Sequence, residues 1–204
     1  MKTLIIIDVQ NDFIPGGTLE VPEGDKIIQV INRIQDKFDL VIATQDWHPS
    51  NHISFASNHK DKKPFEKIEW RGMPQILWPD HCVQNTHGAD FPHDLNMAKT
   101  EAIFRKGMDW QIDSYSGFYD NGHQKNTGLA SYLRERKAKD LFFCGLAADV
   151  CVWFSIIDAL KEGFYVTLIE DATKPIDVNE FVIIKEEIKK LGGKIVMSDD
   201  ISSR

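Results

Sequence analysis

The stretch Leu141-Phe-Phe-Cys-Gly-Leu-Ala-Ala-Asp-Val-Cys151 sets the architecture that we predict for this chain. Its apolar opening, residues 141–144 followed by Gly145, is typical of a strand that is buried on both faces of a parallel sheet. Apolar residues recur at helical spacing after residue 149, so we expect a helix with Asp149 as its N-cap or as an acid of its first turn. Cys151 is therefore expected in the first turn of a helix, just beyond the carboxyl end of a strand.

That position favours a reactive thiol. The positive end of a helix dipole and its free N–H groups lower a thiol pKa, and they can also hold a developing oxyanion. Most unpaired cysteines are nevertheless small, buried hydrophobic residues. This second interpretation suits Cys144, in the middle of the apolar strand, and Cys82. For Cys151 both interpretations stay open on position alone, so we treat it as a candidate nucleophile.

The composition is that of an ordinary globular chain. With 204 residues, 42% of them hydrophobic, it can bury a substantial core in one domain or in one domain with an insertion. The net charge of −7 and the lack of a Lys/Arg block argue against nucleic acid or an anionic membrane as a partner. Three scattered cysteines imply no disulfide framework, so we expect a reducing, cytoplasmic environment. The first apolar run, broken by Asp8, is too short for a signal peptide or a membrane span.

Strand-like and helix-like segments alternate along the chain. Short apolar runs predict strands at residues 4–9, 40–43, 102–105, 141–144, 165–169 and 195–197. Helical spacing predicts helices at residues 25–38, 127–137 and 181–191, besides the one after residue 149. The fold class that follows is α/β, a three-layer doubly wound sandwich with a six-stranded parallel sheet. We expect one domain over residues 1–204, with a loop-rich insertion or lid at about residues 49–100.

Chemically useful residues follow four of the predicted strands. Asp8, Asp46, Lys106 and Cys151 each lie at the carboxyl end of a different strand. In doubly wound sheets ligands bind at this edge, near the point where the strand order reverses. The alternative, ordinary solvated strand ends with capping acids, explains the convergence of acids, an amine and a thiol less well. We therefore expect an active site at this edge.

Asp8, Lys106 and Cys151 have complementary chemistry. A thiol needs a base to remove its proton, and a carboxylate in a partly dehydrated cleft can have its pKa raised enough to do so. A lysine nearby offsets the negative charge of carboxylate and thiolate and lowers the thiol pKa. The three residues lie far apart in the sequence, so their spacing neither supports nor excludes this unit.

A second set of residues has the character of a metal site. Asp46 and His48 are two residues apart, so in extended backbone both side chains point the same way and can reach one ion. His81 is a candidate third ligand, and His52 or Ser54 is a candidate fourth. One carboxylate and two imidazoles suit Zn²⁺, with Fe²⁺ or Mn²⁺ as alternatives and water in the remaining positions. The remaining histidines are expected at the surface: His59, His87, His93 and His123.

Aromatic residues cluster on the loops near these strand ends. Some of them would form a flat slot for an aromatic ring, and others would simply pack the insertion. The candidates are Phe13, Trp47, Trp70, Trp78, Tyr115 and Phe118.

Five motifs, taken together, carry a family resemblance. They are Asp8-Val-Gln-Asn-Asp-Phe13, Gln45-Asp-Trp-His-Pro49 with His52-Ile-Ser-Phe55, Trp78-Pro-Asp-His-Cys-Val83, Arg105-Lys-Gly107 and Gly145-Leu-Ala-Ala-Asp-Val-Cys-Val152. In content and order they resemble the motifs of the nicotinamidase/pyrazinamidase family, which belongs to the isochorismatase-like cysteine hydrolases. They cover nearly the whole chain, and as a set they are specific although each alone is weak.

The resemblance implies a catalytic triad of Asp8, Lys106 and Cys151. It also implies a cis peptide between Leu146 and Ala147, which turns the N–H groups of Ala147 and Cys151 towards the oxyanion of the reaction.

The resemblance further implies a binding site for metal and substrate. Asp46, His48 and His81 would be the ligands of one divalent metal ion, with zinc as the first choice. Phe13 and Trp78 match the positions at which the family stacks the substrate ring.

The implied activity is the hydrolysis of nicotinamide to nicotinate and ammonia through a cysteine thioester, with pyrazinamide as a further substrate. A place in NAD salvage and a homo-oligomeric state would fit such an enzyme. Three alternatives stay open: a related amidohydrolase acting on ureidoacrylate or N-carbamoylsarcosine-like amides, metal-water hydrolysis with Cys151 as a bystander, and non-catalytic binding of a small molecule. A papain-like Cys–His pair fits less well, because no histidine follows Cys151.

Overall fold

The computed structural model describes residues 1–202, and within them the main sheet has six strands, with every neighbouring pair parallel. The strand order is β5-β2-β1-β6-β7-β8. The strands are β1 Lys2–Ile7, β2 Leu40–Asp46, β5 Thr100–Lys106, β6 Asp140–Leu146, β7 Tyr165–Lys174 and β8 Lys194–Val196. Each overlaps a predicted strand, which confirms the predicted fold class. β7 runs past residue 169 because its pairing with β6 resumes after an irregularity, at Gly145 and Leu146.

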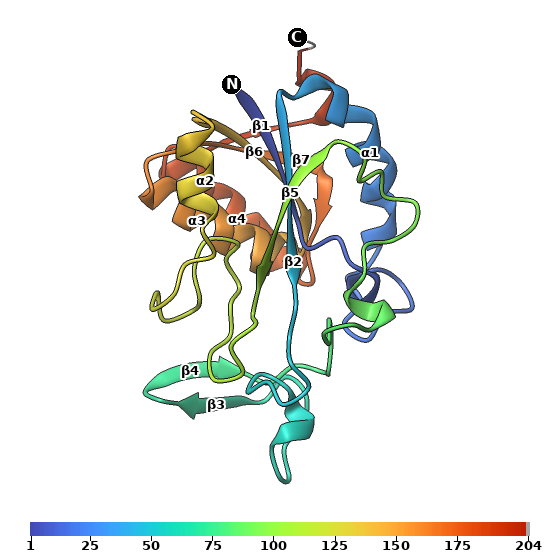
Figure 1. Cartoon of the computed structure of the whole chain (residues 1–204), viewed down its shortest axis with the longest axis vertical. Coiled ribbons are helices and arrows are strands. Elements are labelled where there is room, and N and C mark those ends of the chain that lie inside the picture. Colours follow the sequence, from blue (N-terminus) through green and yellow to red (C-terminus); the bar gives the residue numbers. More distant parts are fainter. Residues whose placement is uncertain (203–204) are drawn as a thin grey trace.

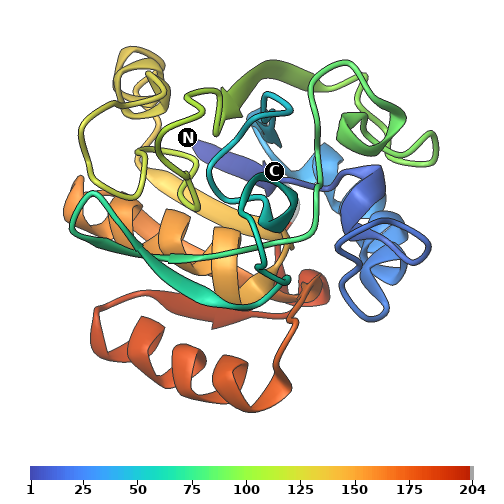
Figure 2. The same cartoon turned by 90° about the horizontal axis from the view of Figure 1, so that it is seen from below.

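Within the described residues, four α-helices flank this sheet, α1 on one face and α2, α3 and α4 on the other (Figures 1 and 2). They are α1 Ile27–Ile34, α2 Leu129–Glu135, α3 Trp153–Lys161 and α4 Val178–Lys190. α1 is shorter than the predicted 25–38 because short 3₁₀ turns, Gly24–Lys26 and Gln35–Lys37, flank it. α4 begins earlier than predicted because the Asp177 side chain accepts two N–H groups of its first turn.

Alternate residues of the central strand β1 pack into different cores. Leu4 and Ile6 lie in the core that contains α1, whereas Ile5 and Ile7 lie in the core that contains α2, α3 and α4. Side chains of a strand alternate between the two faces of its sheet, so a strand covered by helices on both faces must be apolar throughout. This is why the continuous apolar run in the sequence indicated a parallel, doubly covered sheet.

The strand order brings the predicted site together. β5, β2, β1 and β6 are consecutive in the sheet, and these are the four strands whose ends carry Lys106, Asp46, Asp8 and the Cys151 turn. Chain order reverses beside β1, which leaves room for a crevice at its carboxyl end. The amino terminus lies at the opposite end of the molecule, where the Lys2 side chain donates to the Ser202 carbonyl (Figure 1).

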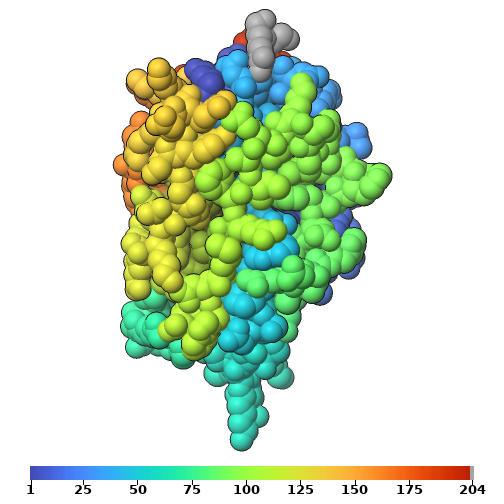
Figure 3. Space-filling view, in the orientation of Figure 1, coloured from blue at the N-terminus to red at the C-terminus, as the bar shows by residue number. Residues whose placement is uncertain are grey.

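The segment of residues 49–100 has more structure than the sequence indicated. It contains an antiparallel hairpin, β3 Lys67–Trp70 and β4 Met73–Ile76, and short 3₁₀ turns at Ala56–Asn58 and His87–Ala89. The hairpin lies beyond the carboxyl ends of β2 and β5 (Figure 1), and the space-filling view shows this end of the molecule tapering to a narrow projection (Figure 3). Strands this short leave little periodic signal, so the hairpin was not predicted.

The turn that carries Cys151 differs from the predicted helix start. Residues Ala148–Val152 form a π-helical turn, and α3 begins only after it. Asp149 lies in this turn but does not cap it. Its carboxylate instead accepts the N–H groups of Ile176 at 2.9 Å and Asp177 at 2.7 Å. The N-cap interpretation was therefore wrong, and the alternative, an acid of the first turn, is confirmed.

Strands from both ends of the chain take part in one sheet, which supports our proposal that residues 1–204 form one domain. Residues 203 and 204 of that proposed domain lie outside the described residues. Within residues 1–202, none of the helices combines the length and the apolar character needed to cross a bilayer.

Gly145 is expected to be irreplaceable in this sheet. Its φ is 111°, and an added Cβ would stand 2.0 Å from the carbonyl oxygen of Ile7. We predict that Gly145→Ala lowers the free energy of unfolding by about 3 kcal/mol, measured by urea denaturation. Gly163→Ala is the control, because Gly163 also has a positive φ but no heavy atom would lie within 4 Å of its Cβ. It should cost only about 1 kcal/mol, and equal losses would contradict the argument.

Candidate active site

Asp8, Lys106 and Cys151 meet at the carboxyl edge of the sheet, as the sequence predicted. The Lys106 Nζ atom lies 2.9 Å from Asp8 Oδ2 and 3.6 Å from Cys151 Sγ. A carboxylate oxygen of Asp8 lies within 4.8 Å of the same sulfur. All three residues are buried, at 0%, 2% and 7% exposure for Asp8, Lys106 and Cys151. The spatial requirement for an acid–amine–thiol unit is met.

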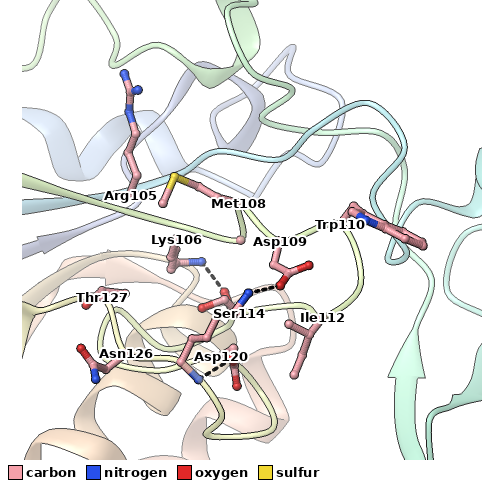
Figure 4. A pocket seen from close by; sticks show the side chains of 12 residues that line it. Arg105, Lys106, Met108, Asp109, Trp110, Ile112, Ser114, Asp120, Asn126 and Thr127 are labelled. Carbon is pink, nitrogen blue, oxygen red and sulfur yellow. Dashed lines mark hydrogen bonds and ion pairs between the residues drawn. The ribbon is translucent and has the colours of Figure 1, made fainter.

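Lys106 has two further partners. Its ammonium donates to Asp46 Oδ1 at 2.9 Å and to the Ser114 carbonyl oxygen at 2.7 Å. Figure 4 shows the contact with Ser114 from the side of a cleft that lies next to the end of β5. The lysine therefore links the nucleophile unit to the candidate metal ligand Asp46.

Burial dominates the protonation of this cluster. It raises the pKa of the Asp8 carboxyl, and it raises the pKa of the Cys151 thiol well above its usual value, although Lys106 opposes both shifts. The sequence had predicted a lowered thiol pKa, and desolvation outweighs that effect. Burial alone would lower the pKa of Lys106, but the carboxylates of Asp46 and Asp8 raise it well above its usual value. The resting cluster thus contains an ammonium and a thiol that keeps its proton until a base accepts it.

Two polar residues that sequence reasoning missed hold the acids in place. The Thr44 hydroxyl donates to Asp8 Oδ1 at 2.6 Å and accepts the N–H of Asp8 at 3.2 Å. The Gln10 side chain accepts the N–H of Asp46 at 2.7 Å and donates to its carbonyl at 2.8 Å. Gln10 lies two residues after Asp8 and within the first family motif, and these were the two signals for it.

Asp46, His48 and His81 also come together, with one side-chain donor atom from each within 4.8 Å of the others. Asp46 Oδ2 lies 3.2 Å from His48 Nε2 and 3.8 Å from His81 Nε2. The Nδ1 atom of His48 lies 2.9 Å from the Gly107 carbonyl, and that of His81 lies 2.7 Å from the Pro79 carbonyl. A carbonyl only accepts, so Nδ1 carries the proton and, in the neutral ring, the Nε2 lone pair is left for a metal.

His52 lies beside this set but in a different arrangement. Its ring centroid is 4.2 Å from that of His48, and its Nδ1 is 2.7 Å from Ser54 Oγ. Within residues 1–202, the buried His52 Nε2 has no hydrogen-bond partner, and the buried His48 Nε2 has only the Asp46 carboxylate beside it, which leaves both lone pairs for a ligand. Burial, followed by the charge on His48, lowers the pKa of His52 to about 4, so its ring is neutral. His52 and Ser54 both remain candidates for the fourth position.

The aromatic candidates divide into two groups. Phe13, Trp78 and Tyr115 line a cavity together with Cys151 and Ala147. The other three lie elsewhere: Trp47 and Phe118 are in the two hydrophobic cores, and the Trp70 indole donates to the Gln111 carbonyl.

The structure also places the cysteines and histidines for which we predicted no role in the site. Cys82 and Cys144 are buried free thiols, and the four other histidines are half-buried or exposed.

The Leu146–Ala147 peptide is cis, as the family resemblance implied. It directly precedes the π-helical turn of Cys151. The Ala147 carbonyl accepts the N–H groups of Val150 and Val152, each at 3.1 Å. These bonds fix the turn next to the cavity.

Comparison with known proteins assigns the chain to a family. The isochorismatase domain model matches residues 2–200, so the chain belongs to that family. Among its relatives, the nicotinamidase of Acinetobacter baylyi is 48% identical over 176 residues, 86% of this chain and 82% of that protein. The nicotinamidase of Escherichia coli is 44% identical over 181 residues, 87% of this chain and 84% of that protein. The ureidoacrylate amidohydrolase of Agrobacterium fabrum is 41% identical over only 128 residues, 63% of this chain and 44% of that protein.

Solved structures give the same result. An Acinetobacter baumanii nicotinamidase and pyrazinamidase superposes with a TM-score of 0.95 at 45% identity, covering 98% of each chain. An L. infantum relative in complex with nicotinate has a TM-score of 0.89 at 36% identity, covering 100% of this chain and 96% of that one. The pyrazinamidase of Pyrococcus horikoshii in complex with zinc has a TM-score of 0.80 at 40% identity, covering 96% and 98%.

Removing the Lys106 ammonium should destabilise the fold. In Lys106→Met the carboxylates of Asp8 and Asp46 lose their buried cation, and we expect the free energy of unfolding to fall by about 3–5 kcal/mol in metal-free protein near neutral pH. The matched control is Lys62→Met, which removes a surface pair with Glu66 and should leave stability almost unchanged. Denaturant titration of both variants measures the difference. Equal stability of Lys106→Met and the unsubstituted chain would show that the buried ammonium is not needed by the fold.

Proposed function

We propose that this protein hydrolyses nicotinamide to nicotinate and ammonia, with Cys151 as the nucleophile. The observation that carries the proposal is the buried contact of Lys106 with both Asp8 and Cys151, at the wall of a cavity lined by aromatic rings. The nicotinamidase relatives that align over most of the chain support the same reaction. Pyrazinamide, which has the same carboxamide on a similar flat ring, is expected to be a second substrate.

The nucleophile is activated by proton transfer within the buried cluster. Because burial raises the pKa of the Asp8 carboxyl, this carboxylate is a stronger base than an exposed aspartate. Asp8 accepts the Cys151 proton, and Lys106 stabilises the resulting thiolate at a contact of 3.6 Å. A raised thiol pKa then has a useful consequence, since the thiolate that forms is intrinsically more nucleophilic.

The thiolate attacks the carboxamide carbon and forms an S–C bond. Charge gathers on the carbonyl oxygen, where we place the backbone N–H groups of Ala147 and Cys151 as donors. Collapse of this intermediate breaks the C–N bond, and Asp8 returns its proton to the departing amide nitrogen, which leaves as ammonia. Asp8 then accepts a proton from water as that water attacks the thioester, and nicotinate leaves with Cys151 again a thiol.

The substrate ring would lie between Phe13 and Trp78. Both side chains are largely buried and line the cavity with Cys151, and Trp78 Nε1 is 3.3 Å from the Tyr115 hydroxyl, which fixes the plane of its indole. A slot with aromatic walls favours a flat ring over the open-chain amide ureidoacrylate. We therefore place the related amidohydrolase activity second, and the ratio of rates on the two substrates tests this order.

Asp46, His48 and His81 would hold one divalent metal ion. Their donor set fits zinc, with iron or manganese as alternatives, and the zinc complex of the Pyrococcus relative supports this choice. When bound there, such an ion supplies a Lewis acid that orients the nitrogen of the substrate ring. The protein's own contribution is to orient the imidazoles through the Gly107 and Pro79 carbonyls.

The cellular setting that we propose is the cytoplasm, where such an enzyme would act in NAD salvage on a small-molecule substrate. The three buried free cysteines are compatible with a reducing compartment. A homo-oligomeric state is part of the same proposal.

Cys151→Ala should abolish ammonia release from nicotinamide, because no nucleophile remains, while the metal content of the protein stays unchanged. Mass spectrometry of the unsubstituted enzyme, quenched during turnover, should detect a nicotinoyl adduct on Cys151. Cys144→Ala is the control, since Cys144 is buried in β6 with its Sγ 3.7 Å from the Ile5 carbonyl. Full amidase activity in Cys151→Ala would rule out the thioester route in favour of hydrolysis by metal-bound water.

Chelation followed by dialysis should lower the rate on nicotinamide by at least about tenfold, and zinc, iron or manganese should restore it. His81→Ala should retain less than half of the metal that the unsubstituted chain binds, measured by elemental analysis. His93→Ala is the control because the His93 side chain is fully exposed. Unchanged metal content in His81→Ala would remove His81 from the ligand set.

A further inference from the structure

Asp113 is a buried acid that the proposed reaction does not use. It is only 3% exposed and lines the cavity with Cys151 and Trp78. Within residues 1–202 its carboxylate is held by two hydrogen-bond donors and not by an ion pair with lysine or arginine. The Ser114 N–H donates to Oδ1 at 2.8 Å, and Gln75 Nε2 donates to Oδ2 at 3.0 Å.

These two bonds connect the β3–β4 hairpin to the nucleophile unit. Gln75 lies in β4 and is 6% exposed, and its Nε2 also donates to the Ile76 carbonyl at 2.7 Å, which fixes its rotamer. Ser114 follows Asp113 directly, and its carbonyl accepts from Lys106 Nζ at 2.7 Å (Figure 4). A continuous chain of contacts therefore runs from Gln75 through Asp113 and Ser114 to Lys106.

The hairpin is independently fixed to the same segment. The Trp70 indole, in β3, donates to the Gln111 carbonyl at 2.8 Å. Asn121 supports the segment from the other side, because its N–H donates to the Asp113 carbonyl at 2.8 Å and its side chain accepts the N–H of Tyr115 at 3.0 Å. The backbone at Asp113 is thus restrained on both sides.

We propose that Gln75 and Asp113 are positioning residues, and that their hydrogen bond sets where the Ser114 carbonyl meets the Lys106 ammonium. The inference rests on the proposed function of Lys106 beside Cys151. Asp8 and Asp46 contact the ammonium at 2.9 Å each, and the Ser114 carbonyl, at 2.7 Å, makes the shortest of these contacts and does not come from an acid. A shift of this carbonyl would therefore move Nζ relative to the Cys151 sulfur. Misplacement of reacting groups by about 1 Å can cost about a hundredfold in rate.

Gln75→Glu tests the link, because it places a second carboxylate against Asp113 and pushes the segment away. We expect kcat on nicotinamide to fall about tenfold with KM changed less than twofold, since the aromatic walls of the cavity stay in place. We also expect alkylation of Cys151 by iodoacetamide at fixed pH to slow by at least threefold. A residue needed only for folding would change neither of these in the protein that remains folded.

A compensating variant separates positioning from misfolding. In Gln75→Glu with Asp113→Asn, the asparagine Nδ2 can donate to the new glutamate while its Oδ1 still accepts the Ser114 N–H. This double variant should recover at least half of the kcat and of the alkylation rate lost in Gln75→Glu. Glu69→Gln is the matched control: Glu69 is exposed on the same hairpin, and its substitution should leave both rates unchanged.

Two results would overturn the proposal. One is a Gln75→Glu protein with unaltered kcat and alkylation rate. The other is a double variant no more active and no more reactive than Gln75→Glu alone. The alkylation rate is read without substrate, so it tests the link even if the unsubstituted enzyme proves inactive on nicotinamide. If either result were found in an enzyme that does hydrolyse nicotinamide, the positioning role would be refuted and the proposed function would stand.

Discussion

The Lys106 ammonium is the charge around which this end of the molecule is built. Its side chain has no solvent exposure and contacts two carboxylates, a carbonyl oxygen and a thiol. Removing an ammonium from water costs several kcal/mol, and only partners in good geometry offset that cost. Those partners come from three other strand ends and from the segment after β5. The ammonium can therefore be buried only when the sheet is complete, which makes the site and the fold parts of one cooperative structure.

Much of this arrangement was readable from the sequence because parallel sheets obey strict rules. Continuous apolar runs identified the strands, and right-handed crossovers place all their carboxyl ends at one edge. Asp8, Asp46, Lys106 and Cys151 could thus be grouped in space although they lie far apart in the chain. His81 follows no strand of the sheet, and its chemistry and the family motif were the only signals for it.

What the sequence did not reveal depends on tertiary contacts of uncharged groups. Gln10 and Thr44 each make two hydrogen bonds to one of the two acids, and nothing in their own identity marks that role. The Ser114 contribution comes from a backbone carbonyl, a group that every residue has. The raised pKa of Cys151 was also missed, because its position predicted the helix dipole but could not predict the extent of burial. Local patterns report periodicity, and these features depend on the packed environment.

The hydrogen bonds of the Asp149 carboxylate limit which residues around the pocket can change during evolution. It ties the turn of Cys151 to the start of the last helix through the N–H groups of Ile176 and Asp177, and Ile176 also borders the cavity. The turn of the nucleophile and one wall of the pocket therefore restrain each other, so a substitution in either would disturb both. Relatives of this chain with a larger pocket would have to gain space at other lining residues, such as Phe13 and Trp78. New selectivity would then arise without disturbing the reactive sulfur.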